Sequence, residues 1–262
     1  MNGNATKSMV VKNFEADVSS KDRFVVNDIR NSRWYMKPVV VKKDILSEGS
    51  YGKVYKIMIL GGDELVMKIS KKSDRFMSSD YVREVAILRR IHEAGRDNDR
   101  IVKLVGANMD DGYRVFFKYY VYGDLVSFLR QSGRRLSTWH KRRMSTDIVM
   151  MLQELRSHNI VHRDIKASNI AVSEGLRCVL LDFGMAVEYN PVSHDLSGRF
   201  VTRVHCRAPE VAVGIYRYSY QADTFSVGCV LWELLTSGER FLRNVDYRRF
   251  RRYGGQAQSI FH

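Results

Sequence analysis

Apolar and polar positions along the chain predict a strand-rich part followed by a helix-rich part. Residues 39–60 alternate in β-branched runs around a glycine turn, which predicts two strands, and "ELVMKIS" at 64–70 predicts a third. Apolar residues at helical spacing over 78–95 indicate one amphipathic helix. Strand-like runs follow at 100–107 and 113–122. We therefore expect strands with a single helix up to residue 122.

Helical patterns dominate the rest of the chain. Residues 123–133 predict a short helix, and residues 137–159 predict a long one with Ser137 or Thr138 as its N-cap. The remaining segments are two short apolar strands, a polar loop and an apolar helix, over 169–173, 178–183, 188–207 and 223–238. Residues 1–38 are polar and weakly periodic, which is typical of an N-terminal extension. The whole pattern predicts an α+β fold with two lobes, 39–122 and 123–262.

Composition narrows the class of protein only moderately. With 262 residues, 45% of them hydrophobic, the chain can bury a substantial core. The net charge of +14 favours anionic partners, among them nucleotides, acidic proteins and nucleic acid. No secretion signal is visible, and the longest apolar stretch, 225–235, is too short for a membrane span. We expect an intracellular protein, cytoplasmic or nuclear, that makes no use of a membrane. Its three cysteines are too scattered for a disulfide framework, and Cys178 and Cys229 are expected to be buried.

The densest group of chemically useful side chains lies in "HRDIKASN", residues 162–169. Asp164, Lys166 and Asn169 place a carboxylate, an ammonium and an amide within six residues. Ionisable groups are costly to bury, so a loop this dense indicates a functional role.

Taken one at a time, the other candidates have ordinary explanations. Gly49 and Gly52 could simply form a hairpin turn. Lys68 could be a surface lysine that extends from an apolar strand, and Glu84 could be a solvated helix residue. Their order along the chain changes this interpretation.

"SEGSYGKV" at 47–54 is followed by Lys68, Glu84, "HRDIKASN", then "DFG" at 182–184 and "APE" at 208–210. This ordered set resembles the eukaryotic-type protein kinase superfamily over about residues 40 to 240. The resemblance implies a bilobal fold, with a β-rich N-lobe that carries one helix and an α-rich C-lobe. It also implies ATP and Mg²⁺ as cofactors and protein hydroxyls as the acceptors of phosphate.

The resemblance assigns the catalytic roles to the same loop. It implies that Asp164 accepts the proton of the substrate hydroxyl and that Lys166 steadies the phosphate in transfer. Asn169 and Asp182 would hold Mg²⁺ through oxygen atoms. A lysine two residues after Asp164 favours the serine/threonine branch.

A nucleotide site is implied as well. The glycine turn would cover the phosphates, Lys68 would pair with them while Glu84 holds the lysine, and apolar side chains would enclose the adenine. The residues implied are Leu46, Ser47, Glu48, Gly49, Ser50, Tyr51, Gly52, Lys53, Val54, Val66, Lys68, Glu84, Lys118, Tyr120, Asp124 and Ala171. By the same resemblance His162 and Phe183 pack in an internal stack that Asp223 anchors, and Phe117 occupies the gatekeeper position.

Two departures from the family pattern concern substrates and regulation. Ser47 replaces the first glycine of the turn, and Arg203 aligns with the usual substrate-positioning threonine. Arg163 precedes Asp164, a pattern that in relatives responds to a phosphate. We expect phosphorylation at Ser193, Ser197 or Thr202, with constitutive activity as the alternative.

The chain stops 24 residues after Gly238, so we expect the C-lobe to lack its last helices after the helix 223–238. Relatives pair Glu210 with an arginine from a later helix. The tail could supply Arg248, Arg249, Arg251 or Arg252 instead, or a partner chain could cover the lobe; the alternative is a solvated Glu210. A kinase this short would fit a viral gene.

Three other functions stay open at this stage. A kinase-fold scaffold would bind ATP and partner proteins without efficient turnover. A small-molecule phosphotransferase would share the catalytic Asp and Asn, but it would lack the "APE" segment at 208–210. Basic runs such as "SGRRLSTWHKRR" could bind nucleic acid, although charge runs are usually solvated surfaces and nucleic acid is an unlikely main partner. We expect protein substrates, with acidic sequences favoured by the positive net charge.

Overall fold

The computed structural model describes residues 32–49, 52–70, 75–94, 99–108, 113–132, 136–189, 206–212 and 219–241. The chain divides into two compact units. The first contains residues up to 97 together with 102–119, and the second contains 98–101 together with 120–262. The division after Tyr119 falls three residues before the boundary expected from the sequence.

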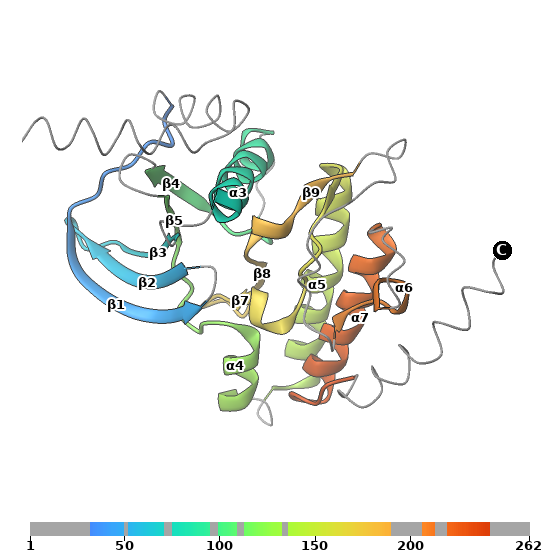
Figure 1. The fold of residues 1–262 in the computed structure, drawn as a ribbon. Coiled ribbons are helices and arrows are strands. Elements are labelled where there is room, and N and C mark those ends of the chain that lie inside the picture. Colours follow the sequence, from blue (N-terminus) through green and yellow to red (C-terminus); the bar gives the residue numbers. More distant parts are fainter. Residues whose placement is uncertain are drawn as a thin grey trace, which may run out of the picture. The chain divides into compact units, whose positions relative to one another are not determined.

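The first unit is built on an antiparallel sheet, which has five strands within the described residues (Figure 1). Its strands follow the order β1-β2-β3-β5-β4. They are β1 (Val40–Gly49), β2 (Gly52–Ile59), β3 (Glu64–Ile69), β4 (Leu104–Asn108) and β5 (Arg114–Lys118). The helix α3 (Arg75–Glu93) follows β3 in the chain and belongs to the same unit. Strands with one helix were predicted here, and both are present.

Strand alternation gives the sheet two different faces. Ile57, Leu65, Met67 and Phe116 are buried together on one face, where Met36 packs against them. Paired residues of neighbouring strands point to the same face. Because Val54 pairs with Lys68, these two side chains share the opposite face. The alternation therefore separates a packed apolar face from a face that carries candidate functional groups.

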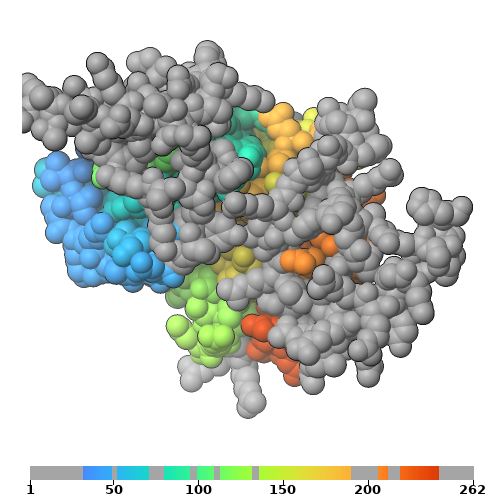
Figure 2. All heavy atoms as spheres, viewed as in Figure 1, coloured from blue at the N-terminus to red at the C-terminus, as the bar shows by residue number. Residues whose placement is uncertain are grey.

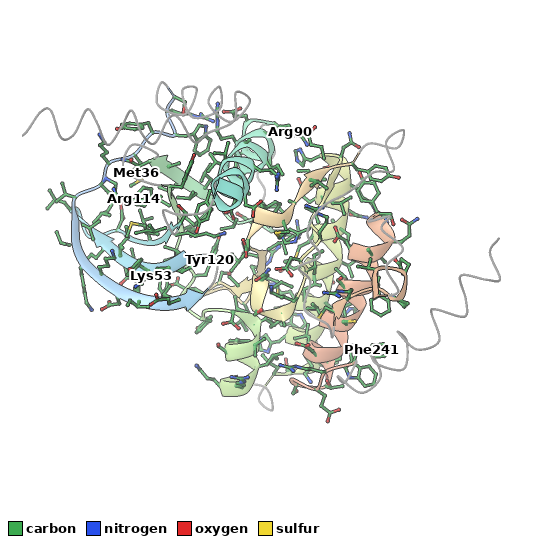
Figure 3. The ribbon with its side chains drawn as sticks, in the orientation of Figure 1. Met36, Lys53, Arg90, Arg114, Tyr120 and Phe241 are labelled. Atoms are coloured by element: carbon green, nitrogen blue, oxygen red, sulfur yellow. The ribbon has the colours of Figure 1, made fainter. Side chains whose placement is uncertain are left out.

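A short segment before β1 is hydrogen-bonded into the first unit. Ala107 of β4 donates its N–H to the carbonyl of Trp34 at 2.7 Å, and Met36 donates its N–H to the carbonyl of Ala107 at 3.0 Å. Met36 is labelled beside β4 in Figure 3. The indole Nε1 of Trp34 donates to Glu93, at the end of α3, at 3.0 Å. Part of the segment expected to be an extension thus ties α3 to the edge of the sheet.

The second unit is mainly helical, as predicted. Its helices are α4 (Leu125–Ser132), α5 (Thr138–Ser157), α6 (Pro209–Ala212) and α7 (Tyr220–Leu235). In the described part of this unit two small antiparallel sheets accompany them, β6 (Ile160–Val161) with β9 (Val187–Glu188), and β7 (Ile170–Val172) with β8 (Cys178–Leu180). Helices α5 and α7 lie side by side in the orange and green part of Figure 1. The prediction of an α+β fold with a sheet-based and a helical lobe is confirmed.

Helix termini explain where two of these helices begin. Ser137 caps α5, since its hydroxyl accepts the N–H of His140, and Ser219 caps α7 by accepting the N–H of Gln221. Helix α7 therefore begins three residues before the segment 223–238 read from the apolar pattern.

A buried carboxylate connects distant parts of the second unit. Asp147 of α5 accepts hydrogen bonds from Arg177 at 2.7 Å, through both Nε and Nη2, and from Arg100 at 3.2 Å. The backbone N–H of Cys178 also donates to it at 3.3 Å. Cys178, Cys206 and Cys229 are all buried, as expected for the first and last of them. Among the described helices, none is long and apolar enough to cross a membrane.

Candidate active site

Lys68 of β3 and Glu84 of α3 form a partly buried ion pair. Lys68 Nζ donates to Glu84 Oε2 at 2.9 Å, and the Glu84 side chain is only 1% exposed. The same ammonium lies 5.1 Å from the centre of the Tyr81 ring, one turn earlier on α3. Neither residue is a solvated surface group, so the ordinary explanations for both are excluded. The pair holds the ammonium in place on the sheet face that also carries Val54.

The glycine turn depends on Gly52. This residue has φ +136°, which L side chains rarely adopt, and a Cβ added to it would lie 2.1 Å from the carbonyl oxygen of Ile69. The Tyr81 hydroxyl would lie 2.8 Å from the same Cβ. Gly52 pairs with Gly49, and the neighbouring Glu48 and Lys53 form an exposed ion pair at 3.1 Å. The backbone thus approaches its neighbours closely here, while Ser50 and Tyr51 lie outside the described residues.

Three other residues expected in the nucleotide site belong to β1 and β3. Leu46 and Ser47 are exposed on β1, and Ser47 pairs with Val54. Val66 pairs with Lys56 of β2 and with Phe117 of β5. By strand alternation and strand pairing Val54, Val66 and Lys68 lie on one face of the sheet.

The remaining nucleotide-site candidates are divided between the units. Lys118 ends β5 in the first unit, and its N–H donates to Lys103 at 3.1 Å. Tyr120 begins the second unit, in which Asp124 forms a β-bridge with Ala171. Both carboxylate oxygens of Asp124 accept hydrogen bonds from Ser127, at 3.0 and 2.9 Å. Asp124 therefore caps α4 as well as being a candidate ribose ligand.

The loop 162–164 is held by Asp223 of α7. This buried carboxylate accepts the N–H of His162 at 2.7 Å and that of Arg163 at 2.9 Å. Arg163 has φ +66°, a strained conformation for a side chain of its size. Its Nε also donates to the carbonyl of Met185 at 2.6 Å. Burial raises the pKa of Asp223 to about 6, and the two backbone N–H groups oppose this effect.

His162 is a neutral structural residue. Burial lowers its pKa to about 4, so the ring carries no charge near neutral pH. Its Nε2 lies 3.0 Å from the carbonyl of Leu181, which makes Nε2 the donor, and Nδ1 accepts the N–H of Asp164 at 3.3 Å. The ring packs edge-on against Phe183, with centroids 4.8 Å apart. The internal stack expected for His162 and Phe183 is present.

Asp164 is the best candidate for a general base. Its Oδ2 accepts from Lys166 Nζ at 2.5 Å and from Asn169 Nδ2 at 2.9 Å. Its Oδ1 is buried without any hydrogen-bond partner in the described structure. Such an acceptor costs free energy unless a ligand satisfies it. Burial raises the pKa of Asp164 to about 6, against the opposing charge of Lys166, so the group is ionised at neutral pH but still basic.

Asn169 and Asp182 are the candidate metal ligands. The amide nitrogen of Asn169 is turned toward Asp164, with a further hydrogen bond to its carbonyl at 3.0 Å, which leaves the amide oxygen as the group available to a cation. Asp182 has φ +60° and begins the 3-10 turn Phe183–Met185. The described residues contain no group of three or more His, Cys, Asp or Glu side chains that could hold a metal ion. Two oxygen ligands nevertheless fit Mg²⁺, which takes one or two protein carboxylates together with substrate phosphates.

One residue near these groups was not anticipated. Tyr81 contacts Lys68 through its ring and lies close to Gly52 through its hydroxyl. Its position three residues before Glu84 was a usable signal, because residues i and i+3 share a helix face.

Several expected features fall outside the described residues. They include the phosphorylation candidates Ser193, Ser197 and Thr202, the departure Arg203, and the tail arginines Arg248, Arg249, Arg251 and Arg252. Glu210 is described in α6 and is partly exposed.

A strand-borne lysine paired with a helix glutamate, and a loop that carries an aspartate, a lysine and an asparagine, are together typical of enzymes that transfer phosphate to proteins. A family model described as "Protein kinase domain" matches residues 40–261. The chain belongs to the protein kinase family.

Curated relatives support this assignment. Mitogen-activated protein kinase p38b of Drosophila melanogaster is 28% identical over 84% of this chain and 60% of its own length. CTD kinase subunit alpha of Schizosaccharomyces pombe is 32% identical over 81% of this chain and 35% of its own length. Tyrosine-protein kinase Fer of Mus musculus is 28% identical over 74% of this chain and 23% of its own length. The chain thus spans about three fifths or less of these relatives.

Proposed function

We propose that this chain is an active serine/threonine protein kinase, which transfers the γ-phosphate of ATP to hydroxyl groups of protein substrates. The observation that carries the proposal is the buried, unpartnered Oδ1 of Asp164, beside an Oδ2 that Lys166 and Asn169 hold. A scaffold that no longer turns over has no use for a buried acceptor whose maintenance costs free energy.

Each unit supplies its own set of side chains and backbone groups to the proposed reaction. In the first unit Lys68, held by Glu84, provides a cation for the ATP phosphates, and the turn at Gly52 provides backbone N–H groups. In the second unit Asn169 and Asp182 would hold Mg²⁺, which neutralises charge on the phosphate oxygens when it is bound. Asp124 and Ala171 are proposed to contact the nucleoside.

Asp164 is proposed to orient the acceptor hydroxyl through Oδ1 and to take its proton. A pKa of about 6 suits this role, because the carboxylate is ionised at pH 7 while it retains affinity for a proton. Lys166 lies on the other oxygen, where its charge keeps Asp164 ionised and can also meet a phosphate oxygen.

Preference for serine and threonine is supported by Lys166 and by one relative whose name says serine/threonine-protein kinase, although another relative is a tyrosine kinase. An intracellular location and acidic protein substrates complete the proposal, the latter because the net charge is +14.

The test is phosphate transfer from labelled ATP to mixed protein substrates, with the wild type compared to Asp164→Asn and Asp182→Ala. We expect labelled serine or threonine with the wild type and a fall of roughly 10²–10⁴-fold with Asp164→Asn. ATP binding, followed separately by a fluorescent analogue, should survive in Asp164→Asn and be lost in Lys68→Met. Binding of ATP without any transfer by the wild type would identify a scaffold, and labelled tyrosine would refute the serine/threonine assignment.

A further inference from the structure

Two cysteines from different segments meet in the interior of the second unit. Cys206 begins the described segment 206–212, which contains α6, and Cys229 lies in α7. Both residues are buried. The thiol of Cys206 donates a hydrogen bond to the sulfur of Cys229. The fold therefore brings the two sulfur atoms into direct contact.

Other contacts hold the segment that carries Cys206 against α7. The hydroxyl of Ser226 donates to the carbonyl of Cys206 at 2.7 Å. Ser226 lies three residues before Cys229, so the two side chains share a face of the helix. Further along the same segment, Val211 packs with Ala222 of α7 in one apolar cluster. These contacts keep the two thiols together without any bond between the sulfur atoms.

The two thiols differ as nucleophiles. The hydrogen bond from Cys206 lowers the pKa of Cys229, and burial opposes this effect. The same hydrogen bond, followed by burial, raises the pKa of Cys206. Burial also raises the pKa of the third cysteine, Cys178 of β8. Because the thiolate is the reactive form of cysteine, Cys229 is the most nucleophilic of the three.

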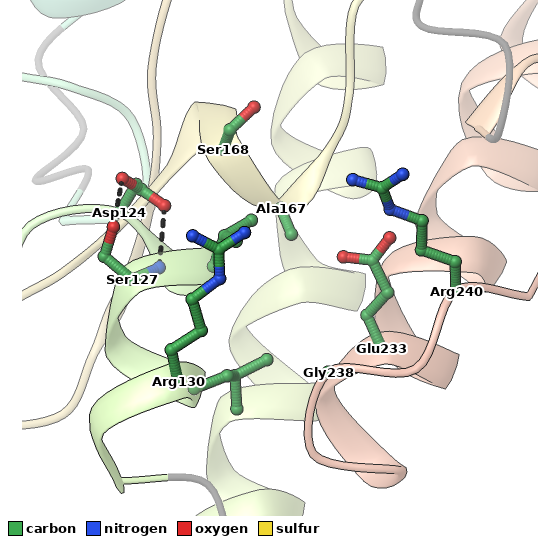
Figure 4. A pocket seen from close by; sticks show the side chains of 10 residues that line it. Asp124, Ser127, Arg130, Ala167, Ser168, Glu233, Gly238 and Arg240 are labelled. Carbon is green, nitrogen blue, oxygen red and sulfur yellow. Dashed lines mark hydrogen bonds between the residues drawn. The ribbon is translucent and has the colours of Figure 1, made fainter.

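A pocket of about 270 Å³ provides a route from solvent toward this pair (Figure 4). Its walls come from α4, from the 3-10 turn Ala167–Asn169 and from the end of α7, and its lining includes Arg130 and Arg240. Glu233 also lines the pocket. It lies one turn after Cys229 on α7, and its charge raises the pKa of both thiols. In Figure 2 both α4 (light green) and the end of α7 (red) reach the surface. A small neutral oxidant can thus come within one helical turn of Cys229.

We propose that Cys206 and Cys229 are a site of reversible oxidation, at which hydrogen peroxide joins them in a disulfide. The thiolate of Cys229 attacks one oxygen of the peroxide, so that an S–O bond forms, the O–O bond breaks and hydroxide leaves. The sulfur of Cys206 then displaces the second hydroxide from this sulfenic acid, and the S–S bond forms. The two thiols lose two electrons in total. Their two protons combine with the two hydroxide ions, so the peroxide is reduced to two molecules of water.

The disulfide connects the segment 206–212 covalently to the helix that holds the loop 162–164. Asp223 of α7 accepts two backbone N–H groups of that loop, and the charge of Asp164 acts on the thiol of Cys206. The oxidation site therefore lies beside the candidate active site. The inference does not depend on the proposed kinase function, because the contact between the thiols exists without it.

A metal site and inert packing are the competing roles for two adjacent thiols. The described residues contain no group of three or more His, Cys, Asp or Glu side chains that could hold a metal ion. Structural zinc takes four such ligands, so the pair alone is a poor metal site. Inert packing differs from the proposal in its outcome, because it leaves both thiols reduced in the presence of peroxide.

The first experiment treats the folded, reduced protein with hydrogen peroxide and then blocks the remaining thiols with iodoacetamide. Mass spectrometry of the digested protein identifies the cross-linked peptides. We expect a cross-link between Cys206 and Cys229 that dithiothreitol removes, with Cys178 still reduced. The absence of this cross-link, or a main cross-link through Cys178, overturns the proposal. So does zinc that protects both thiols of the reduced protein from iodoacetamide.

Cys178→Ser is the matched control, since it removes the buried thiol outside the pair and should leave the cross-link unchanged. Cys206→Ser should stop oxidation at the sulfenic acid of Cys229, which dimedone traps. Oxidation of the wild type in guanidinium chloride should give cross-links through Cys178 as well, because the fold then no longer selects the pair. The same mixture of cross-links from the folded protein would count against a positioned pair.

A second experiment needs no variant and compares the thermal melting of the oxidised and the reduced wild type. A cross-link that fits the fold restricts the unfolded chain and should raise Tm by roughly 5–10 °C. Dithiothreitol should reverse this increase. An oxidised protein that melts below the reduced one would mean that the bond distorts the fold, which contradicts thiols already placed to form it.

Discussion

Replacement of Asp164 by Asn should raise the stability of the protein at neutral pH while it removes activity. Burial raises the pKa of this carboxyl from 3.8 to about 6, so its charged form is held at a cost in the folded state. At 1.36 kcal/mol per pKa unit the cost is about 3 kcal/mol. Asparagine keeps the shape without the charge, and we expect a gain of about 1–3 kcal/mol, which corresponds to a Tm increase of roughly 2–10 °C.

The stability difference between the two proteins should change with pH in a direction that the raised pKa of Asp164 fixes. A carboxyl whose pKa is higher in the folded than in the unfolded state stabilises the fold below the unfolded value and loses that contribution as pH rises through the folded value. Wild-type Asp164 should therefore recover the missing stability between pH 6 and pH 4. The advantage of Asp164→Asn should be largest above pH 7 and nearly absent at pH 4. Asp223 has a raised pKa in the same range and is present in both proteins; the charge of Asp164 is the last of the effects on that pKa, so most of the Asp223 contribution cancels.

Thermal melting of both proteins at several pH values between 4 and 8 is the assay, with activity measured on the same samples. Asp63→Asn serves as the control, because Asp63 is exposed and its replacement should leave Tm unchanged at every pH. An Asp164→Asn protein that melts below the wild type at pH 7.5 would refute the reasoning. So would a difference that does not change with pH.

Three further outcomes are expected. Gly52→Ala should lower both Tm and ATP affinity, because the new Cβ would lie 2.1 Å from the carbonyl oxygen of Ile69; Gly62→Ala, also at positive φ but with no atom within 4 Å, is the control and should cost less. Asp147→Ala should destabilise the second unit by about 2–4 kcal/mol in denaturant unfolding, since Arg100 and Arg177 lose a buried partner but remain partly exposed. The value of kcat/KM should fall about tenfold per pH unit below about pH 6 as Asp164 takes up a proton, and an unchanged rate at pH 5 would count against it as the base.

Sequence order was sufficient to find the residues that carry the proposed chemistry. Lys68 and Glu84 were identified sixteen residues apart, and they form an ion pair at 2.9 Å. These features are local or belong to a fixed motif, and a single chain therefore reveals them.

Long-range partnerships were not visible in the same way. Asp147 looks like an ordinary polar residue of a helix, and its partners Arg100 and Arg177 lie 47 and 30 residues away. Arg130 and Arg240 lie in different segments, and only folding brings them to one pocket. Local periodicity reports which face of an element is buried, but not which distant side chain meets it.

Trp34 lies before the first family motif and contacts Glu93 at the end of α3. The family motifs alone therefore do not show where the folded kinase domain begins. A recombinant chain that began at Val39 would retain every family motif, yet it would lose the indole that holds the end of α3 and the backbone bonds to Ala107. Gly106 has space for Met36 and Trp34 only because it lacks a side chain, so their removal would also leave a furrow on β4. Glu84 belongs to the helix that Trp34 secures. Shortening at the N-terminus would thus loosen the helix that carries Glu84, which lies fifty residues after Trp34 in the sequence.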